Sequence, residues 1–236
     1  MGKVMKRTYS YVFLLPAVVI YVVIFIVPTA MSFFFSMTRW TLTDWEFTGL
    51  ENFRTFFAEH SLNIGFRNTF IYAVVTSGLK VVFGLLLGVF LTGQWRSRGY
   101  LRSVVFFPTL VSTIAVGVAF SMMMHPTEGI INKGLALLGL SGVDWLGNPR
   151  IALLSVAFVD IWKGVGLATV IYMAGIMSIP QEYYEALRVD GGNALHKFWN
   201  ITLPLCRPAM NTVIILSFIG GLRSFDLIWA MTKGGP

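Results

Sequence analysis

Long apolar runs separated by polar segments are the feature that most constrains this chain. The five runs are Tyr11 to Phe35, Thr69 to Leu91, Val104 to Met124, Ile151 to Ile179 and Met210 to Met231. Each has about 20 residues or more, which is the length that an α-helix needs to cross about 30 Å of hydrocarbon. Pro108 interrupts the third run, and membrane helices tolerate such a proline. The runs predict an all-α, polytopic transmembrane helix bundle with five visible spans.

Composition indicates the same class of protein. Hydrophobic residues make up 56% of the 236 residues, charged residues make up 12%, and the mean hydropathy is +0.71, which is unusual for a soluble domain. The net charge of +7 does not indicate nucleic-acid binding, because the basic residues are scattered near the ends of the apolar runs. The first run follows a basic start, but it is too long for a cleaved signal peptide and lacks a small-residue cleavage site. We expect it to be a retained first span.

The distribution of basic residues orients the spans. One set of polar segments, the start, residues 94–102 and residues 181–208, holds nine basic and three acidic residues. The alternate set, residues 36–67 and 125–150, holds five basic and six acidic residues. Cytoplasmic loops of membrane proteins carry an excess of Lys and Arg. We therefore expect the amino terminus and the 181–208 loop to face the cytoplasm.

The 181–208 loop reads as two short helices joined by a glycine turn. Helix-forming residues run from Glu182 to Val189, and the Asp-Gly-Gly sequence at 190–192 ends this first helix, because glycine adopts positive φ without a Cβ penalty. Asn193 is a suitable N-cap for a second helix from Ala194 to Thr202. The prolines expected to end it are Pro204 and Pro208. Such a unit can lie at the membrane surface and offer its turn to a soluble partner.

Several residues of this loop follow a recurring pattern. They are Glu185, Ala186, Asp190, Gly191, Phe198, Ile201, Leu203, Pro204 and Pro208. At this spacing they resemble the EAA loop of bacterial ABC importer permeases, in which EAA, four residues, G and later I-x-L-P recur. Leu187 departs from that pattern, which most often has a second alanine there. The resemblance implies that Glu185 contacts an ATPase subunit and that Gly191 permits the turn. The implied ATPase-coupling residues are Glu185, Ala186, Asp190, Gly191, Leu203 and Pro204.

Two further segments resemble the same superfamily. Phe47 to Phe57, FTGLENFRTFF, is similar to the phrase before the second span of sugar-type permeases, and Phe225 to Pro236, FDLIWAMTKGGP, is similar to the outer end of the fifth span in maltose, glycerol-phosphate and multiple-sugar permeases. A further span follows in that family, so we expect a sixth helix to be missing at the C-terminus. The resemblance implies a type I ABC importer fold. Residues 1–66 would hold the start, first span and first outer loop, and residues 67–236 the ABC transmembrane type-1 permease domain.

The function implied by the resemblance is that of a permease subunit of an ATP-driven importer in the bacterial cytoplasmic membrane. Its implied partners are a second permease subunit in a heterodimer, two ATPase subunits on the cytoplasmic side, and an extracytoplasmic solute-binding protein. The solute would be a sugar or sugar-like molecule.

Charged residues inside the apolar runs are a second set of candidates. Asp160 and Lys163 lie three apart on the fourth run, as do Arg223 and Asp226 on the fifth, so each pair is expected to share a helix face and neutralise itself. The two runs cross in opposite directions, which places both pairs in the outer half of the bilayer. With Trp162 nearby, they are expected to border the translocation path or its outer gate. The alternative is that they are intrahelical salt bridges that only make the helices insertable.

Lys80 stands midway along the second run with no acidic residue four positions away. A charge at the centre of a membrane helix usually faces a cavity or a partner. We therefore expect Lys80 to pair with another helix or subunit, and we include it among the candidate path residues.

The sequence contains no recognisable catalytic or metal-binding pattern. Cys206 is the single cysteine, and His60, His125 and His196 are far apart, so neither a disulfide nor a metal centre is expected. No G-x-x-x-x-G-K-[ST], G-x-S-x-G or H-E-x-x-H motif occurs. We expect no cofactor and no enzymatic activity, with ATP hydrolysed by a separate subunit. The alternatives are an ion-coupled secondary transporter, with the four paired charges as a relay, and a membrane-embedded enzyme, whose reactive cluster is not found.

Overall fold

The computed structural model describes residues 11–94 and 96–235, and the chain divides into two compact units between Phe66 and Arg67. The basic start, with Lys3, Lys6 and Arg7, and the final Pro236 lie outside the described residues. Each unit is described by itself.

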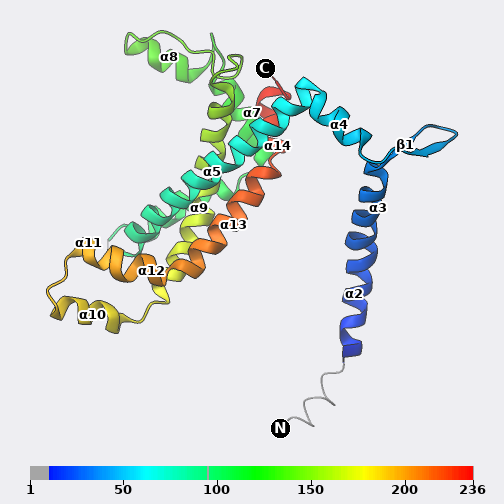
Figure 1. The fold of residues 1–236 in the computed structure, drawn as a ribbon. Coiled ribbons are helices and arrows are strands. Elements are labelled where there is room, and N and C mark those ends of the chain that lie inside the picture. The colour runs from blue at the N-terminus through cyan, green and yellow to red at the C-terminus, as the bar shows by residue number, and fades with distance from the viewer. Residues whose placement is uncertain (1–10, 95, 236) are drawn as a thin grey trace. The chain divides into compact units, whose positions relative to one another are not determined.

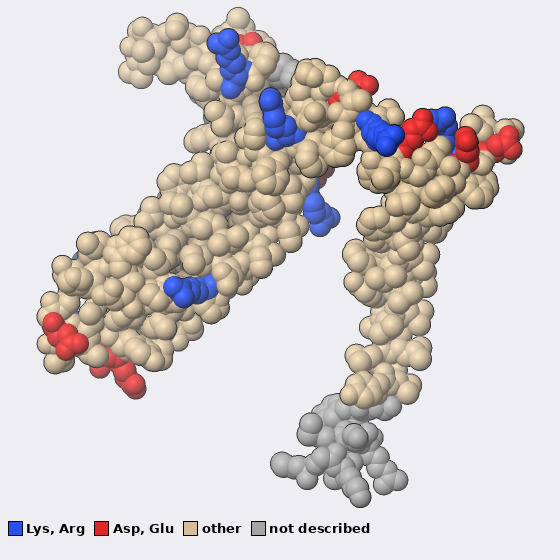
Figure 2. All heavy atoms as spheres, viewed as in Figure 1, with Lys and Arg blue, Asp and Glu red and all other residues tan. Residues whose placement is uncertain are grey.

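The first unit opens with one long apolar helical run. It comprises η1 (Tyr11–Leu14), α2 (Leu15–Tyr21), the π-helical turn η2 (Val22–Ile26) and α3 (Val27–Ser36). Its visible surface carries no charged side chain (Figure 2), and none of its residues is buried. A helix that is apolar on every side is typical of a membrane span. The predicted first span is confirmed, because residues Tyr11–Ser36 form a helix long and apolar enough to cross a membrane.

A short β-hairpin and a helix follow within the same unit. Strands β1 (Thr38–Trp40) and β2 (Trp45–Phe47) pair antiparallel, and Trp40 stacks on Trp45 with ring centroids 5.9 Å apart. Helix α4 (Glu51–Ala58) is tied back to the hairpin by the Asn52 side chain, which donates hydrogen bonds to the backbone oxygens of Ser36 and Thr38. This hairpin is the one departure from the predicted all-α architecture among the described residues.

The second unit is a bundle of helices (Figure 1). Its helices are α5 (His60–Thr92, which starts in the first unit), α6 (Arg98–Leu110), α7 (Thr113–Met123), α8 (Ile130–Leu137), α9 (Ala152–Met177), α10 (Gln181–Val189), α11 (Ala194–Lys197), the π-helical turn η3 (Phe198–Thr202), α12 (Leu203–Leu205), α13 (Arg207–Leu222) and α14 (Asp226–Thr232). Much of the visible flank of this unit is uncharged (Figure 2).

Helices α5 and α9 pack closely through glycines. A Cβ on Gly84 would lie 2.7 Å from Ala168 Cβ, and a Cβ on Gly88 would lie 2.8 Å from Tyr172 Cβ. Only glycine allows the two backbones to approach this far. The spacing Gly84-x-x-x-Gly88 therefore serves helix packing.

Two of the predicted spans are broken. Helices α6 and α7 bend by 96° at Val111 and Ser112, both of which have extended backbone. The fifth run is interrupted after Leu222, where α13 ends, and it resumes as α14 at Asp226. Three helices are individually long and apolar enough to cross a membrane. The number rises to five if two bent helix pairs, Arg98–Leu110 with Thr113–Met123 and Ala194–Leu205 with Arg207–Leu222, each form one span. The apolar runs did not indicate these breaks, because apolar composition does not report the backbone conformation.

The buried apolar residues form two main clusters in the second unit. One lies toward α7 and α14 and includes Tyr72, Val116, Val159 and Leu227. The other joins α5, α9 and α13 and consists of Leu85, Ala168, Tyr172, Ile176, Cys206 and Val213. Together they hold the helices that surround the candidate site described next.

Candidate functional site

The 181–208 loop turns on Gly191, as the sequence predicts. Gly191 has a φ of +72°, and its N–H donates to Arg188 O at 3.1 Å while the Gly192 N–H donates to Leu187 O at 2.8 Å. These two bonds are those of a Schellman turn, which closes the end of α10. A side chain at position 191 would cost about 1–2 kcal/mol, because its Cβ would crowd the backbone in the left-handed region.

Leu187, the departure from the EAA pattern, has a structural role in this turn. Its side chain packs against the small cluster of Ile179, Tyr184 and Ile201. A Cβ on Gly192 would collide with Leu187 Cγ. Glycine at position 192 therefore leaves room for the leucine that joins α10 to the second helix.

The second helix begins as predicted but continues further. The Asn193 side chain accepts hydrogen bonds from the N–H groups of Leu195 and His196 at 3.0 and 2.9 Å, as an N-cap does. The prediction that Pro204 ends the helix was wrong. The π-helical turn η3 comes directly before α12, and Pro204 lies in the first turn of α12. The missing N–H of a proline is tolerated there, because that N–H has no partner within the helix.

Pro208 likewise lies in the first turn of α13 instead of ending the previous helix. The two helical segments, Ala194–Leu205 and Arg207–Leu222, meet at a bend of 67°. The loop is therefore connected directly to α13 without an intervening flexible segment.

The two halves of the loop are packed together and onto the bundle. Tyr184 is buried, its hydroxyl lies 3.3 Å from Thr202 Oγ1, and Lys197 Nζ lies 4.5 Å above its ring. Phe198 and Leu203 pack against the cluster that joins α5, α9 and α13. These contacts connect the loop to the transmembrane helices.

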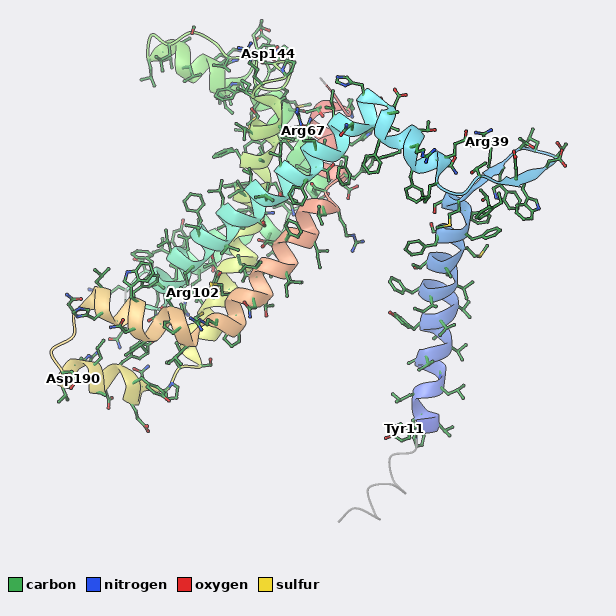
Figure 3. All side chains as sticks on the ribbon, viewed as in Figure 1. Tyr11, Arg39, Arg67, Arg102, Asp144 and Asp190 are labelled. Carbon is green, nitrogen blue, oxygen red and sulfur yellow. The ribbon has the colours of Figure 1, made fainter. Side chains whose placement is uncertain are left out.

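The predicted coupling residues fall into two groups. Glu185, Ala186, Asp190 and Gly191 are exposed on α10 and its turn, whereas Leu203 and Pro204 are half-buried at the base of the loop. The first four are thus accessible and Leu203 packs against the bundle, while their role in coupling stays a prediction. The tip of the loop, near Asp190, and Arg102 lie toward one end of the second unit and Asp144 lies at the other (Figure 3).

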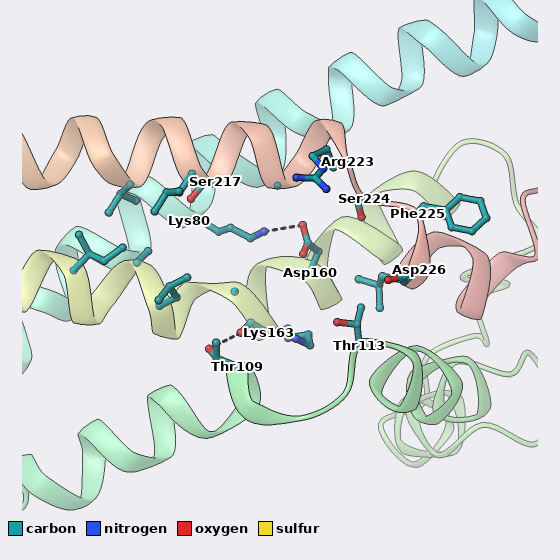
Figure 4. A pocket seen from close by; sticks show the side chains of 18 residues that line it. Lys80, Thr109, Thr113, Asp160, Lys163, Ser217, Arg223, Ser224, Phe225 and Asp226 are labelled. Atoms are coloured by element: carbon teal, nitrogen blue, oxygen red, sulfur yellow. Dashed lines mark hydrogen bonds and ion pairs between the residues drawn. The ribbon is translucent and has the colours of Figure 1, made fainter. Parts of the chain in front are cut away.

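A cavity of about 330 Å³, lined by both charged and apolar side chains, lies between the helices of the bundle (Figure 4). Residues from α5, α6, α7, α9, α13, α14 and the break between the last two helices line it. The charged side chains of the lining are Lys80, Asp160, Lys163, Arg223 and Asp226. The two expected charge pairs and Lys80 therefore line the same cavity, and their role in transport stays a prediction.

Lys80 and Asp160 form an ion pair across the bundle. Lys80 Nζ of α5 lies 2.8 Å from Asp160 Oδ2 of α9, and the two side chains are only 9% and 19% exposed. The pairing of Lys80 with another helix is confirmed, whereas the expected Asp160–Lys163 pair was wrong. Lys80 reaches Asp160 beside Gly164, where a Cβ would lie 2.7 Å from Lys80 Cε.

The expected pair of Arg223 and Asp226 also does not form. Arg223 follows the last residue of α13 and Asp226 begins α14, so the spacing of three no longer places them on one helix face. In the described part of the chain, neither they nor Lys163 take part in a salt bridge. An unpaired charge at the centre of a membrane helix costs about 2.5–3.5 kcal/mol on insertion scales, and a polar cavity lowers that cost.

Trp162 lies away from this cavity. It lines an apolar groove between α5 and α9, and its ring centroid is 5.2 Å from that of Phe120. Two residues along a helix amount to a rotation of about 200°, which separates Trp162 from Asp160. Its expected position beside the charged residues was therefore wrong.

Sequence reasoning missed several polar residues of the site. Thr109 donates a hydrogen bond from Oγ1 to Lys163 O at 3.0 Å and so ties the end of α6 to α9. Ser224, at the α13–α14 break, donates to Tyr72 Oη at 3.4 Å. For Tyr72 the available signal was the polar repeat of Tyr72, Thr76 and Lys80, which lie four residues apart and therefore close to one face of the helix.

The fold and site define a multi-pass helical membrane protein with a cavity inside its bundle that contains charged side chains. A family model described as "Binding-protein-dependent transport system inner membrane component" matches residues 80–235. The chain therefore belongs to this family of transport components.

Similar proteins extend the match over nearly the whole chain. The trehalose/maltose transport system permease protein MalF of Thermococcus litoralis is 32% identical over 229 residues, which cover 96% of this chain and 78% of that protein. The multiple sugar-binding transport system permease protein MsmF of Streptococcus mutans is 29% identical over 238 residues, which cover 99% of this chain and 81% of that protein. A solved bacterial ABC transporter involved in the import of the acidic polysaccharide alginate has a chain with a TM-score of 0.75 and 23% identity, with 94% of this chain and 77% of that chain covered. This last likeness concerns the fold.

Proposed function

We propose that this chain is the permease subunit of an ATP-driven importer that moves a saccharide delivered by an extracytoplasmic binding protein. The family assignment supports transport, and the names of the similar permeases, for trehalose or maltose and for multiple sugars, support a saccharide as the solute. The proposed assembly contains a second permease and two ATPase subunits that bind the cytoplasmic loops. The proposed location is the bacterial cytoplasmic membrane, with the amino terminus inside.

The observation that carries this proposal is the physical connection between the 181–208 loop and the cavity. Glu185 and Gly191 are exposed at the loop, while Phe198 and Leu203 of the same loop pack against α5, α9 and α13. Helices α9 and α13 in turn line the cavity. A displacement of the loop by an ATPase would therefore reach the cavity walls through packed helices. Alternating access would follow from hinge or shear motion of these helices.

The residues have distinct proposed roles. Glu185, Ala186, Asp190 and Gly191 form the surface that the ATPase contacts, and Leu203 and Pro204 hold that surface to the bundle. Lys80, Asp160, Lys163, Arg223 and Asp226 line the translocation path. Trp162 has no proposed role in the path, because it lies on the apolar side of α9.

Co-purification with the ATPase tests the coupling role. The full-length permease is expressed with its partner subunits and captured in detergent, and the retained ATPase is quantified. Gly191→Val and Glu185→Lys should reduce the retained ATPase at least ten-fold while leaving membrane insertion intact. Uptake of solute should fall in parallel.

The chain offers a matched control for Gly191→Val. Gly139, after α8, has a φ of +74°, and the same pair of turn bonds, Gly139 N–H to Ala136 O and Leu140 N–H to Leu135 O, closes that helix. Figure 1 places α8 and the α10–α11 turn at opposite ends of the second unit. Gly139→Val imposes the same backbone strain and should retain the ATPase. Normal ATPase retention in both loop variants would contradict the coupling role and favour an ion-coupled carrier, whose uptake persists without ATP and stops when the ion gradient is removed.

A further inference from the structure

The charges that line the central cavity do not balance. The lining holds three basic side chains, Lys80, Lys163 and Arg223, and two acidic ones, Asp160 and Asp226. Lys80 and Asp160 neutralise each other at 2.8 Å. Asp226 can offset one of the two remaining cations, so the cavity keeps one positive charge in excess.

The two remaining cations come from different parts of the bundle. Lys163 belongs to α9, and Arg223 directly follows α13. In Figure 4 they lie on either side of the Lys80–Asp160 pair. Within residues 11–94 and 96–235, neither forms an ion pair with any acidic side chain. The cavity lining offers these two cations one remaining acidic residue, Asp226, so one positive charge is left without a counter-charge.

A counter-charge in this cavity would be strongly held. The membrane-embedded surroundings screen charges less than bulk water does, so attraction between opposite charges is strengthened. A guanidinium binds carboxylate, sulfonate or phosphate oxygens through paired hydrogen bonds, and an ammonium adds a point charge. The hydroxyl groups of a neutral sugar do not require either cation, because uncharged amide and hydroxyl side chains bind them as well.

We propose that the solute of this importer is an anionic saccharide, whose oxyanion group is held between Arg223 and Lys163 during translocation. This inference rests on the proposed import function and names the class of solute. It assigns Arg223 and Lys163 to solute recognition and Lys80 and Asp160 to a neutral wall of the cavity.

The first test uses the whole transporter in lipid vesicles with ATP on the ATPase side. The vesicles receive binding protein and an equimolar mixture of maltose, trehalose, trehalose 6-phosphate, a glucuronate-containing disaccharide and the methyl ester of that disaccharide. Mass spectrometry identifies what accumulates. At least one anionic sugar should accumulate ten-fold or more above its neutral counterpart. Equal or preferential accumulation of a neutral sugar would overturn the inference and leave the import function standing, whereas accumulation of no sugar would overturn both.

The second test changes the two cations and uses the anionic sugar that accumulates. Arg223→Gln and Lys163→Gln should each lower its uptake at least ten-fold, and Arg223→Lys should retain a larger share. Lys133→Gln is the matched control, because Lys133 is an exposed cation paired with Glu128 in the 125–150 segment. Unchanged uptake in both glutamine variants would refute the assignment. Loss of the second permease from either variant would show that the cation pairs with that subunit, which also overturns the inference.

Discussion

The ion pair between Lys80 and Asp160 shows how a charge is accommodated inside this bundle. Burying two charges costs desolvation energy that their attraction recovers only when the geometry is good. Here Gly164 makes room for the lysine stem, and the partners meet at 2.8 Å. The pair therefore joins α5 to α9 at the wall of the cavity.

Removing one partner of the Lys80–Asp160 pair should destabilise the protein much more than removing both partners. Lys80→Met leaves Asp160 without its counter-charge and should destabilise the protein by about 3 kcal/mol. The double variant Lys80→Met with Asp160→Leu should recover most of that loss. Unfolding in detergent, followed for the wild type, both single variants and the double variant, measures the coupling. Additive losses would show that the pair does not form.

Transport adds a separate readout for the same residues. If Lys80 acts only through folding, uptake per folded transporter should be unchanged in the double variant. Normal uptake by a folded Lys80→Ala variant would remove Lys80 from the translocation path.

At the level of elements, the breaks in the α6–α7 and α13–α14 segments shape the site. Irregular backbone at membrane depth is tolerated where it lines a polar cavity or is buried in protein. Thr109 and Thr113 flank the first break, and Arg223 and Ser224 form part of the second. All four residues line the cavity. The broken helices thus supply polar groups that continuous apolar helices would lack.

The N-cap of α11 should contribute measurably to the order of the 181–208 loop. Asn193→Ala removes the acceptor of two backbone N–H groups and should destabilise the local helix by about 1 kcal/mol. Hydrogen exchange at Leu195 and His196 should rise about five-fold. Asn200→Ala, at an exposed position of the same helical segment, should leave that exchange unchanged. Equal protection in the two variants would mean that the cap has no role in holding the loop.

At the level of the whole molecule, the predicted orientation in the membrane depends on which end of the second unit carries the basic loops. Arg102 lies toward the same end of the second unit as the tip of the 181–208 loop, and Asp144 lies at the opposite end (Figure 3). This arrangement agrees with the alternation that the positive-inside rule predicts. Sidedness itself stays a prediction.

Cysteine labelling in intact cells tests that orientation. The natural Cys206 is only 1% exposed, and Cys206→Ser provides a background without thiols. In that background, Leu138→Cys, at a position 76% exposed, should react with a membrane-impermeant maleimide from outside. Glu185→Cys, on the exposed face of α10, should react only after the cells are made permeable. The reverse pattern would invert the proposed topology.

Sequence alone determined the features that depend on local chemistry. Apolar runs define membrane helices because lipid offers no backbone partners, Gly191 marks a left-handed turn because other residues crowd it, and Asn193 caps a helix through its own side chain. The EAA-like spacing also pointed to the family that the comparisons confirm.

Only the tertiary structure decided how the charges and helix breaks combine. Residue spacing favoured pairs within one helix, but Asp160 meets Lys80 from another helix, and a break separates Arg223 from Asp226. Trp162 turned out to face an apolar groove. These features depend on contacts between segments far apart in the chain, such as the 80 positions between Lys80 and Asp160. Local propensity carries no information on such contacts, because their energy exists only after the helices have packed.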